Sequence, residues 1–541
     1  MIKKILPFIL IVLLFQCIKA QDEFITIWKP NAVSSPVNAP VAATNTQIWF
    51  PGKGENFTIT WEEVGYPQHS GTLQNVTSAL QILIDFGTPL NPDPSTTFYR
   101  LKVSNGNGTF RQLQFGTPNT YVFQHIVTSW KLFGSAEKLV DIEQWGKIHW
   151  DSMNAAFVEC KNMNMTATDA PDLSGVTDAS YMFHNAHKFF GNPSMASWNT
   201  STIKNFRSMF GYSVTVGINT PTDLFNPPIG SWDTSSAENM SFMFNVRKAF
   251  NQNLNSWNVS NVTDMSYMFA SCESFNQPVD QWNVSKVKNI AYMFHFIPVF
   301  NQSLATWDTS NVNNMEHIFH GNTAFDQPLQ TWNVSKVTNM DTSFDSASSF
   351  NQPLDTWDTH NVTNMSYLFS NASSFNQSLE VWNLTSLTSA FRMISESGMD
   401  CSNYSRTLRG WAINSNTPNN IMLGALTPFA YSSDVSAFRD TLINKGWGLL
   451  GDVAGECRFL GVSDVQSTHS VTLFPNPADQ IIYIKNLKGG RSYKIFDSSG
   501  RIALQNVLDR DYIDVGSLTS GNYILQLTTD RGSQILKFIK K

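Results

Sequence analysis

The stretch FNQPLDTWDTHNVTNMSYLF, residues 350–369, is one copy of a phrase that returns every 25 residues through the middle of the chain. Its Trp recurs at equal steps, at Trp232, Trp257, Trp282, Trp307, Trp332, Trp357 and Trp382. A Phe stands seven residues before each Trp, at Phe225, Phe250, Phe275, Phe300, Phe325, Phe350 and Phe375. Each copy also carries an aliphatic residue before the Trp, an Asn or Asp directly after it, and a Met-Phe pair or its equivalent further on. A strict period of this length predicts a solenoid of stacked coils.

The repeated apolar residues predict the core of that solenoid. One coil cannot bury its apolar face alone, but stacked coils pack each residue on its equivalent in the next turn. We therefore interpret the Trp and Phe columns as a buried spine, and the Asn columns as amide ladders that satisfy backbone groups at the bends. The predicted fold class is a mainly β and irregular solenoid, with a short strand around 254–259 and a helical turn around 265–269 in each coil.

A functional interpretation of the Trp column is a row of sugar-stacking platforms. Such platforms need exposed rings, whereas each Trp shares an apolar face with the Phe and the aliphatic residue before it. The positions that vary between copies are better candidates for a contact surface. Examples are ASCES at 270–274 and HFIPV at 295–299.

The first residues, MIKKILPFILIVLLFQCIKAQ, have the pattern of a secretory signal peptide. Lys3 and Lys4 precede an apolar run at 5–15, and cleavage is expected after Ala20. The run is too short to cross a bilayer, and no later segment approaches eighteen continuous apolar residues. We expect no transmembrane segment in the mature chain.

The charge of the chain argues against one class of partner, and its cysteines suggest one disulfide. Removing Lys3, Lys4 and Lys19 from the 36 basic residues leaves 33 against 42 acidic ones, which argues against nucleic acid as a partner. Cys401 and Cys457 bracket the segment after the last repeat, and in an oxidising compartment they could form a disulfide.

Composition and turn signals divide the rest of the chain. We predict a β-sandwich-like domain at 21–135, the repeats at 136–393, a C-terminal cap at 394–458, a linker at 459–469 and a small β-sandwich at 470–541. About ten residues near 211–221 interrupt the period.

Several phrases resemble a known family. IEQWG at 142–146, DAPDLSGVTDASYMF at 169–183 and the opening stretch look like the BspA-like leucine-rich surface-protein repeats of bacteria. The resemblance covers about 140–458 and implies a leucine-rich-repeat type solenoid on secreted or surface proteins, several of them adhesins. FITIWKPN and TQIWFPGKG are similar to the PKD-like β-sandwich that often precedes these repeats.

The C-terminal phrases LFPNPADQIIYI, YKIFDSSGRIAL and IDVGSLTSGNYILQL resemble the type A sorting domain of the type IX secretion system of the Bacteroidetes. This resemblance implies export across the outer membrane, with the type IX machinery as a partner and a secreted or surface location. The residues that match the motif include Pro475, Asn476, Pro477, Gly500, Gly521 and Tyr523.

The sequence offers little chemistry. His184 and His187, and His317 and His320, are spaced by three but lack a carboxylate or Cys set nearby in the sequence. Paired carboxylates, a phosphate loop and a nucleophile elbow are not recognisable. We therefore expect no catalytic residue, no cofactor, no metal and no enzyme activity.

The function predicted from these features is adhesion or binding to an extracellular protein or glycan at the cell surface. The alternative is a carbohydrate-binding protein that uses exposed aromatic residues.

Overall fold

A computed structural model describes the protein in two compact units, residues 1–459 and 460–541, and each is considered by itself. The predicted signal peptide, residues 1–20, and the predicted linker, 459–469, lie outside the described residues. The described residues are 22–35, 37–122, 126–213, 223–425, 428–455, 457, 472–485, 490–497, 500–529 and 532–541.

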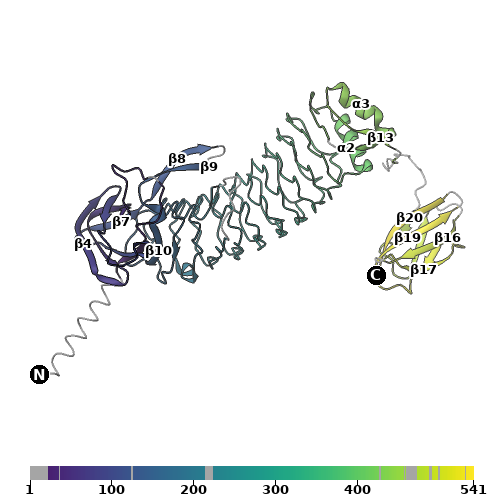
Figure 1. The fold of residues 1–541 in the computed structure, drawn as a ribbon. Helices are drawn as coiled ribbons and strands as arrows, with labels where there is room; N and C mark the ends of the chain where they lie inside the picture. The colour runs from purple at the N-terminus through teal and green to yellow at the C-terminus, as the bar shows by residue number, and fades with distance from the viewer. Residues whose placement is uncertain are drawn as a thin grey trace. The chain divides into compact units, whose positions relative to one another are not determined.

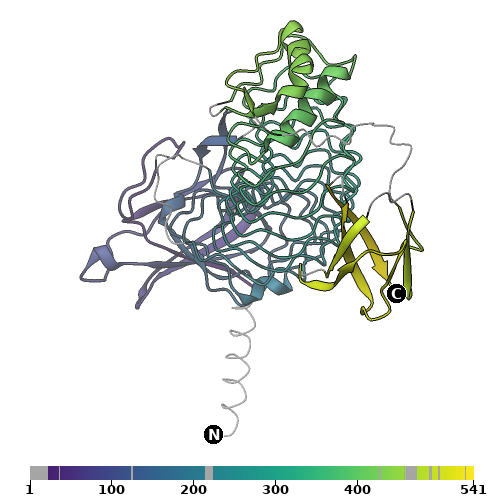
Figure 2. The same cartoon turned by 90° about the vertical axis from the view of Figure 1, so that its right-hand side faces the viewer.

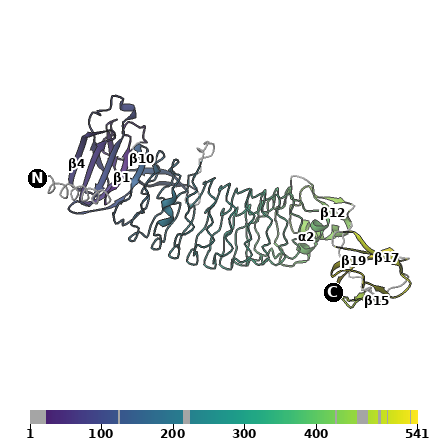
Figure 3. The same ribbon diagram turned by 90° about the horizontal axis from the view of Figure 1, so that it is seen from below.

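The N-terminal part of the first unit is built on a seven-stranded sheet with the order β11-β10-β1-β6-β3-β4, in which β7 also pairs with β3 (Figure 3). Two further pairs, β2 with β5 and β8 with β9, stand apart from it. Alternate residues of β1 are buried, so one face of the sheet lies on the core. The strands are β1 (Phe24–Trp28), β2 (Gln47–Phe50), β3 (Gly52–Glu63), β4 (Tyr66–Ser78), β5 (Ile82–Asp85), β6 (Tyr99–Ser104), β7 (Thr109–Leu113), β8 (Gly116–Val122), β9 (Ile126–Leu132), β10 (Leu139–Gln144) and β11 (Asn164–Met165); η2 (Pro94–Thr96), η3 (Ala136–Lys138) and η4 (Pro193–Ser197) are short 3₁₀ helices.

The sheet continues into the repeats without a break in the core. β11 pairs in parallel with β10, and a single buried cluster extends from Phe24 to Leu449. Trp145 and Trp150 lie at the junction, with ring centroids 5.7 and 5.2 Å from that of Phe24. The N-terminal sheet therefore closes the first end of the repeat stack.

Figure 1 shows the repeats as a row of turns, and single parallel bridges join each repeat to the next. Between η4 and the helix α2 (Cys401–Ile413), the described residues contain no helix and no strand longer than one such bridge. The bridged residues are Asp178, Asn205, Asn239, Asp264, Asn289, Asn314, Asn339, Asn364 and Ser389, and from Asn239 onward they are 25 residues apart.

Aromatic side chains stack between the repeats. The Trp side chains of the column are 1–3% exposed, and ring centroids in the stacked pairs of neighbours are 6.1–6.4 Å apart. The Phe rings from Phe250 to Phe375 are fully buried at spacings of 6.0–6.2 Å. Each indole also donates a hydrogen bond to the preceding repeat, as from Trp307 Nε1 to the carbonyl of Val279 at 3.0 Å.

The two kinds of Asn position have different roles. The Asn after each Trp bonds within its own turn, as where Asn258 Oδ1 accepts from the backbone N of Ser260 at 3.1 Å. A ladder between repeats is made instead by the Asn after each Phe: Asn276 Oδ1 accepts from the backbone N of Asn301 at 3.1 Å. The amide ladder thus belongs to a different column from the Asn that follows Trp.

The segment expected to be a helical turn is a series of tight turns. Tyr267 has a φ of 58°, and so does Ser271, which is incompatible with a right-handed helix. Met268 N donates to Met265 O at 3.2 Å, as in a turn that requires positive φ at its third residue. The backbone N of Tyr267 donates a hydrogen bond to Ala291 O in the next repeat at 2.9 Å.

The predicted fold class, a leucine-rich-repeat type solenoid between two β-sandwiches, is wrong. The repeats have neither the predicted strand at 254–259 nor the helical turn at 265–269. The protein consists mostly of sheets of different sizes and irregular turns, with little helix. The repeats are held together by aromatic stacks and single bridges.

Two helices follow the last repeat, α2 (Cys401–Ile413) and α3 (Ser436–Asn444), with the short 3₁₀ helix η5 (Ser433–Val435) between them. Figure 2 shows them at the end of the stack. Trp411 of α2 donates from Nε1 to Leu379 O at 3.0 Å, which continues the indole bonds of the repeats. β12 (Ala430–Ser432) pairs in parallel with β13 (Val453–Gly455), and a disulfide joins Cys401 to Cys457, whose Cα atoms are 6.1 Å apart.

The second unit has its own core, which includes Ile482, Ile495, Leu525 and Phe538. A three-stranded sheet has the order β14-β15-β18, and a four-stranded sheet has the order β17-β16-β19-β20. The strands are β14 (Thr472–Phe474), β15 (Ile481–Lys485), β16 (Gly490–Phe496), β17 (Ile502–Val507), β18 (Tyr512–Asp514), β19 (Gly521–Thr529) and β20 (Gly532–Lys540).

Candidate functional site

The tight turns give the repeats a surface that we name the turn face. It is formed by the left-handed residues of the repeats, which are the third residue after the bridged one and, except in the repeat of Asn205, also the seventh, together with their neighbours. The third residues have φ between 52° and 61°: Tyr181, Ser208, Phe242, Tyr267, Tyr292, His317, Thr342, Tyr367 and Arg392. The seventh residues have φ between 51° and 70°: Asn185, Val246, Ser271, Phe296, Gly321, Ser346, Asn371 and Glu396.

Four of the third residues form an aromatic ladder: Phe242, Tyr267, Tyr292 and His317. Successive ring centroids are 4.3, 4.2 and 4.3 Å apart, and the planes are tilted by only 8–9°. Burial raises the pKa of the Tyr267 and Tyr292 hydroxyls above the ordinary value, so both groups stay protonated. The ladder therefore presents ring edges and hydroxyl groups, because the flat faces of its inner rings cover one another.

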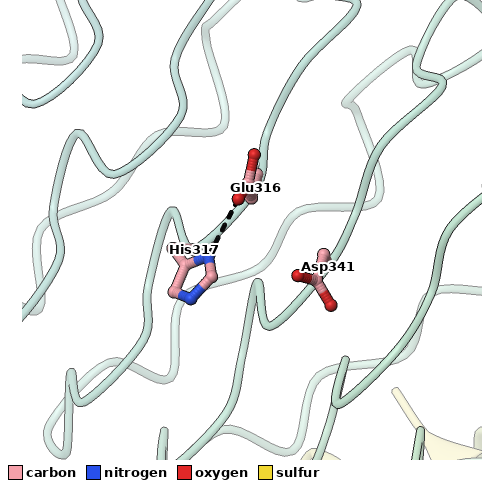
Figure 4. A group of neighbouring side chains, drawn as sticks. All are labelled: Glu316, His317 and Asp341. Atoms are coloured by element: carbon pink, nitrogen blue, oxygen red, sulfur yellow. Dashed lines mark ion pairs between the residues drawn. The ribbon is translucent and has the colours of Figure 1, made fainter. Parts of the chain in front are cut away.

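The ladder ends beside two carboxylates, and together they form an acid–imidazole group of Glu316, His317 and Asp341 (Figure 4). One potential ligand atom from each side chain lies within 4.8 Å of the others. His317 Nδ1 is 3.6 Å from Glu316 Oε1, and Tyr292 Oη donates to the same oxygen at 3.2 Å. Burial raises the pKa of Asp341, an effect that His317 partly offsets.

Two further imidazoles lie next to His317. Ring centroids are 5.9 Å apart between His295 and His317, and 5.3 Å apart between His317 and His320. Burial lowers the pKa of His295 to about 3 and also lowers that of His320, whose Nε2 lies 3.4 Å from an Asp345 carboxylate oxygen. Both imidazoles are therefore neutral at pH 7.

Apolar side chains border this group. Phe296 is 47% exposed and Val299 is 42% exposed, whereas Ile297 between them is buried. Gly321 has a φ of 70°, and an added Cβ there would overlap the Phe296 ring. Of the predicted contact segment 295–299, Phe296, Pro298 and Val299 are exposed, and Phe296 is a left-handed residue of the turn face.

The β8–β9 hairpin covers the first repeats of the turn face (Figure 1). The Trp130 ring centroid lies 5.2 Å from that of Tyr181 and 5.6 Å from that of His184. His184 is 4% exposed and hydrogen-bonds with Ser208 Oγ at 2.8 Å. Burial, with Arg247 and other cations nearby, lowers the pKa of His184 to about 3. His184 and His187 thus belong to a packed region.

The residues predicted for the sorting motif lie in the second unit. Asn476 Oδ1 accepts from Ile539 N at 2.9 Å, and Tyr523 Oη donates to Thr519 O at 2.9 Å. Asn476, Gly500 and Tyr523 line one surface pocket of about 660 Å³. Gly521 opens β19, and Pro475 and Pro477 each follow a cis peptide bond.

Sequence reasoning missed the carboxylates near His317. In the sequence, His317 and His320 have no group of carboxylates around them that predicts a metal site. In the structure, Asp341 and Asp345 of the next repeat lie beside them. Aligning the copies on the bridged residue would have found them, because Glu316 and Asp341 are both the second residue after it.

Comparison with known families gives two matches. Residues 127–219, 219–310 and 296–411 match the family described as "Mycoplasma protein of unknown function, DUF285", and together they span more than half of the chain. The chain belongs to this family. The description assigns no activity to the DUF285 repeats, and it does not name the BspA-like repeats. A search of curated proteins finds no match.

The second match decides the location of this DUF285 protein. Residues 472–541 match a secretion system C-terminal sorting domain, which supports export by type IX secretion and an interaction with that machinery. The protein is secreted or held at the cell surface, so the predicted localisation is confirmed. Among the described residues, no helix is long and apolar enough to cross a membrane.

Proposed function

We propose that this DUF285 protein is a non-enzymatic adhesion protein that binds a protein partner outside the cell through its turn face. The observation that carries the proposal is a contrast within one repeat. The buried columns keep Trp and Phe in copy after copy, whereas the left-handed positions change from Tyr to His, Thr or Arg. A surface that differs between copies can recognise a partner at one place along the stack.

The exposed residues of the turn face have the composition of a protein interface. Aromatic residues are enriched at the centres of such interfaces, and exposed apolar patches mark interaction sites. Phe296 and Val299 supply apolar surface, and the ladder adds the ring edges of Tyr267 and Tyr292, whose centroids are 4.2 Å apart. The hydroxyl groups of the ladder add hydrogen-bonding capacity to apolar rings.

A glycan partner fits this geometry less well. Sugar rings stack on free aromatic faces, but the Trp column is 1–3% exposed and the ladder rings are only 4.2–4.3 Å apart. Phe296 is tilted against the His295 and His320 rings at 4.3 and 4.8 Å. We therefore favour a protein partner over a carbohydrate. The resemblance of the repeat phrases to BspA-like surface proteins, several of them adhesins, supports the same choice.

The test is binding of the mature full-length chain to arrays of extracellular proteins, glycans and whole cells. The Phe296→Ser variant should weaken binding at least tenfold. The matched control is Val381→Ser, because Val381 is 58% exposed in another part of the repeat. Absence of binding to every array, or equal loss in both variants, would contradict the proposal, and binding to glycans alone would favour the carbohydrate alternative.

Export has a separate test. A chain that lacks residues 472–541 should remain inside the cell, whereas the full-length chain should be found outside it. Immunoblots of cell and culture fractions measure the difference. Normal appearance of the shortened chain outside the cell would contradict a sorting role for this unit.

A further inference from the structure

We propose that Glu316, His317 and Asp341 form a binding site for a divalent transition-metal ion of the zinc class. The inference is independent of the adhesion partner, since it concerns a small ion and three side chains within two adjacent repeats. Among the described residues, these are the three His, Cys, Asp or Glu side chains whose potential ligand atoms all lie within 4.8 Å of one another.

The distance between the His317 and Glu316 side chains suits a shared metal ion better than a direct hydrogen bond. His317 Nδ1 and Glu316 Oε1 are 3.6 Å apart, beyond the range of a normal hydrogen bond. Two ligands of a tetrahedral zinc ion, each roughly 2.0–2.1 Å from it, lie roughly 3.4 Å from one another. His317 Nδ1 is also shielded from solvent and has no hydrogen-bond partner in the structure. The nitrogen is therefore available to a metal ion.

The ligand types select the class of ion. One imidazole and two carboxylates form a nitrogen and oxygen set that suits zinc and related divalent ions. Calcium prefers six to eight oxygen ligands, which this group does not offer. The His317 and Glu316 side chains are 18% and 12% exposed, so the group lies close to the surface, where a water molecule is the fourth ligand expected of an open zinc site.

Neighbouring side chains hold the ligands in place. Glu316 accepts hydrogen bonds on both oxygens, from Tyr292 Oη at 3.2 Å and from Asn339 Nδ2 at 3.1 Å. The His317 ring is stacked on Tyr292 with 8° between the planes. Such supporting contacts are typical of metal sites, where they fix the orientation of each ligand.

Zinc titration of the mature full-length chain, made without a histidine tag, tests the proposal. Calorimetry at pH 7 should show one strong site, and zinc should raise the melting temperature. The His317→Ala and Asp341→Asn variants should each bind zinc at least tenfold more weakly and lose the melting shift. Asp341→Asn changes no volume, and its circular dichroism spectrum checks that the fold is retained.

The matched control is His360→Ala. His360 Nδ1 lies 2.8 Å from an Asp358 carboxylate oxygen, so the variant removes another exposed imidazole beside an acid in the same repeats. Its zinc affinity should equal that of the wild type. The proposal is overturned if the wild type binds no zinc, or if His317→Ala and Asp341→Asn bind it as tightly as the control does.

Discussion

Two sets of stacked rings run along the same repeats, the buried Trp column and the aromatic ladder of the turn face, and they tolerate different changes. Every Trp from 232 to 382 is retained because each fills the same closed space and bonds to the preceding repeat. The ladder has an open edge, so Phe242, Tyr267, Tyr292 and His317 can differ in chemistry while their rings stay 4.2–4.3 Å apart. Burial on all sides keeps the same residue in every copy, whereas the third position after the bridge also accepts Ser208, Thr342 and Arg392.

The largest effect should come from breaking the buried column. Trp307→Ala should lower the free energy of unfolding by about 3–5 kcal/mol, because it leaves a cavity and removes the indole hydrogen bond to the Val279 carbonyl. Tyr292→Ala on the ladder should cost about 1 kcal/mol, the scale of an aromatic pair. Urea denaturation of both variants measures the difference. Equal losses would mean that the two columns do not differ as described.

A second change concerns the first regular repeats, where a charged side chain replaces an apolar one. Arg247 is fully buried where Cys272 and Ile297 stand in the next two copies. Its Nη1 lies 3.2 Å from Asp223 Oδ1, and its guanidinium lies over the Phe225 ring at 4.5 Å. Arg247→Met should cost about 3 kcal/mol, because it leaves the Asp223 carboxylate buried without its cation.

Denaturation of the double variant Arg247→Met with Asp223→Asn provides the control. Removing the negative charge as well should restore part of the lost stability. A double variant less stable than Arg247→Met alone would contradict this account of the pair.

A third prediction uses pH to compare covered and open parts of the turn face. The pKa of His184 is lowered to about 3, mainly by burial under the β8–β9 hairpin, against about 6.5 when unfolded. Below pH 6.5 the unfolded chain therefore binds a proton that the folded chain does not, so stability is full above pH 6.5 and falls between pH 6.5 and 3. Between pH 7 and 5 this group should account for about 2 kcal/mol of lost stability.

The measurement is urea denaturation of wild type and His184→Gln at several pH values. The variant should lose stability less steeply between pH 7 and 5, by about the same 2 kcal/mol. Parallel pH profiles would show that His184 is not held neutral in the fold.

The smallest effect concerns the left-handed positions. Ser271 has a φ of 58° at the position that Gly321 occupies two repeats later. Ser271→Gly relieves a backbone strain of about 1–2 kcal/mol but gives up about 0.5–1 kcal/mol through the freer unfolded chain. A net gain of about 0–1.5 kcal/mol is expected in urea denaturation. A loss above 1 kcal/mol would contradict a strained backbone at this position.

The sequence reveals the buried Trp column but not the backbone conformation of the turn face. The spacing of Trp307 and Trp332 is visible directly, and equivalent residues do stack in the structure. The local conformation was missed because Met265, Met268 and Phe269 have the i, i+3, i+4 spacing of a helix. Nothing in the identity of Tyr267 signals a positive φ, since the backbone bond to Ala291 in the next repeat imposes it.

The candidate metal group illustrates a similar limit. Glu316 and Asp341 are 25 residues apart, and only the stacking of consecutive repeats brings them together. Short-range spacing rules therefore cannot find such a group. The location of the protein, in contrast, was predictable because the sorting domain is recognised from a contiguous stretch, residues 472–541.

The indole bond from each repeat to the one before it also bears on how such a chain can change length in evolution. Trp332 donates to the carbonyl of Leu304, and Trp357 donates to that of Leu329, through the same geometry at 3.0 Å. Loss or duplication of one 25-residue copy would leave each indole facing an equivalent carbonyl, up to Trp411 in α2. The 34-residue step from Trp198 to Trp232, whose rings are also stacked at 6.0 Å, shows that added residues can be accommodated between copies, so gain or loss of whole copies is one tolerated route to a longer or shorter protein.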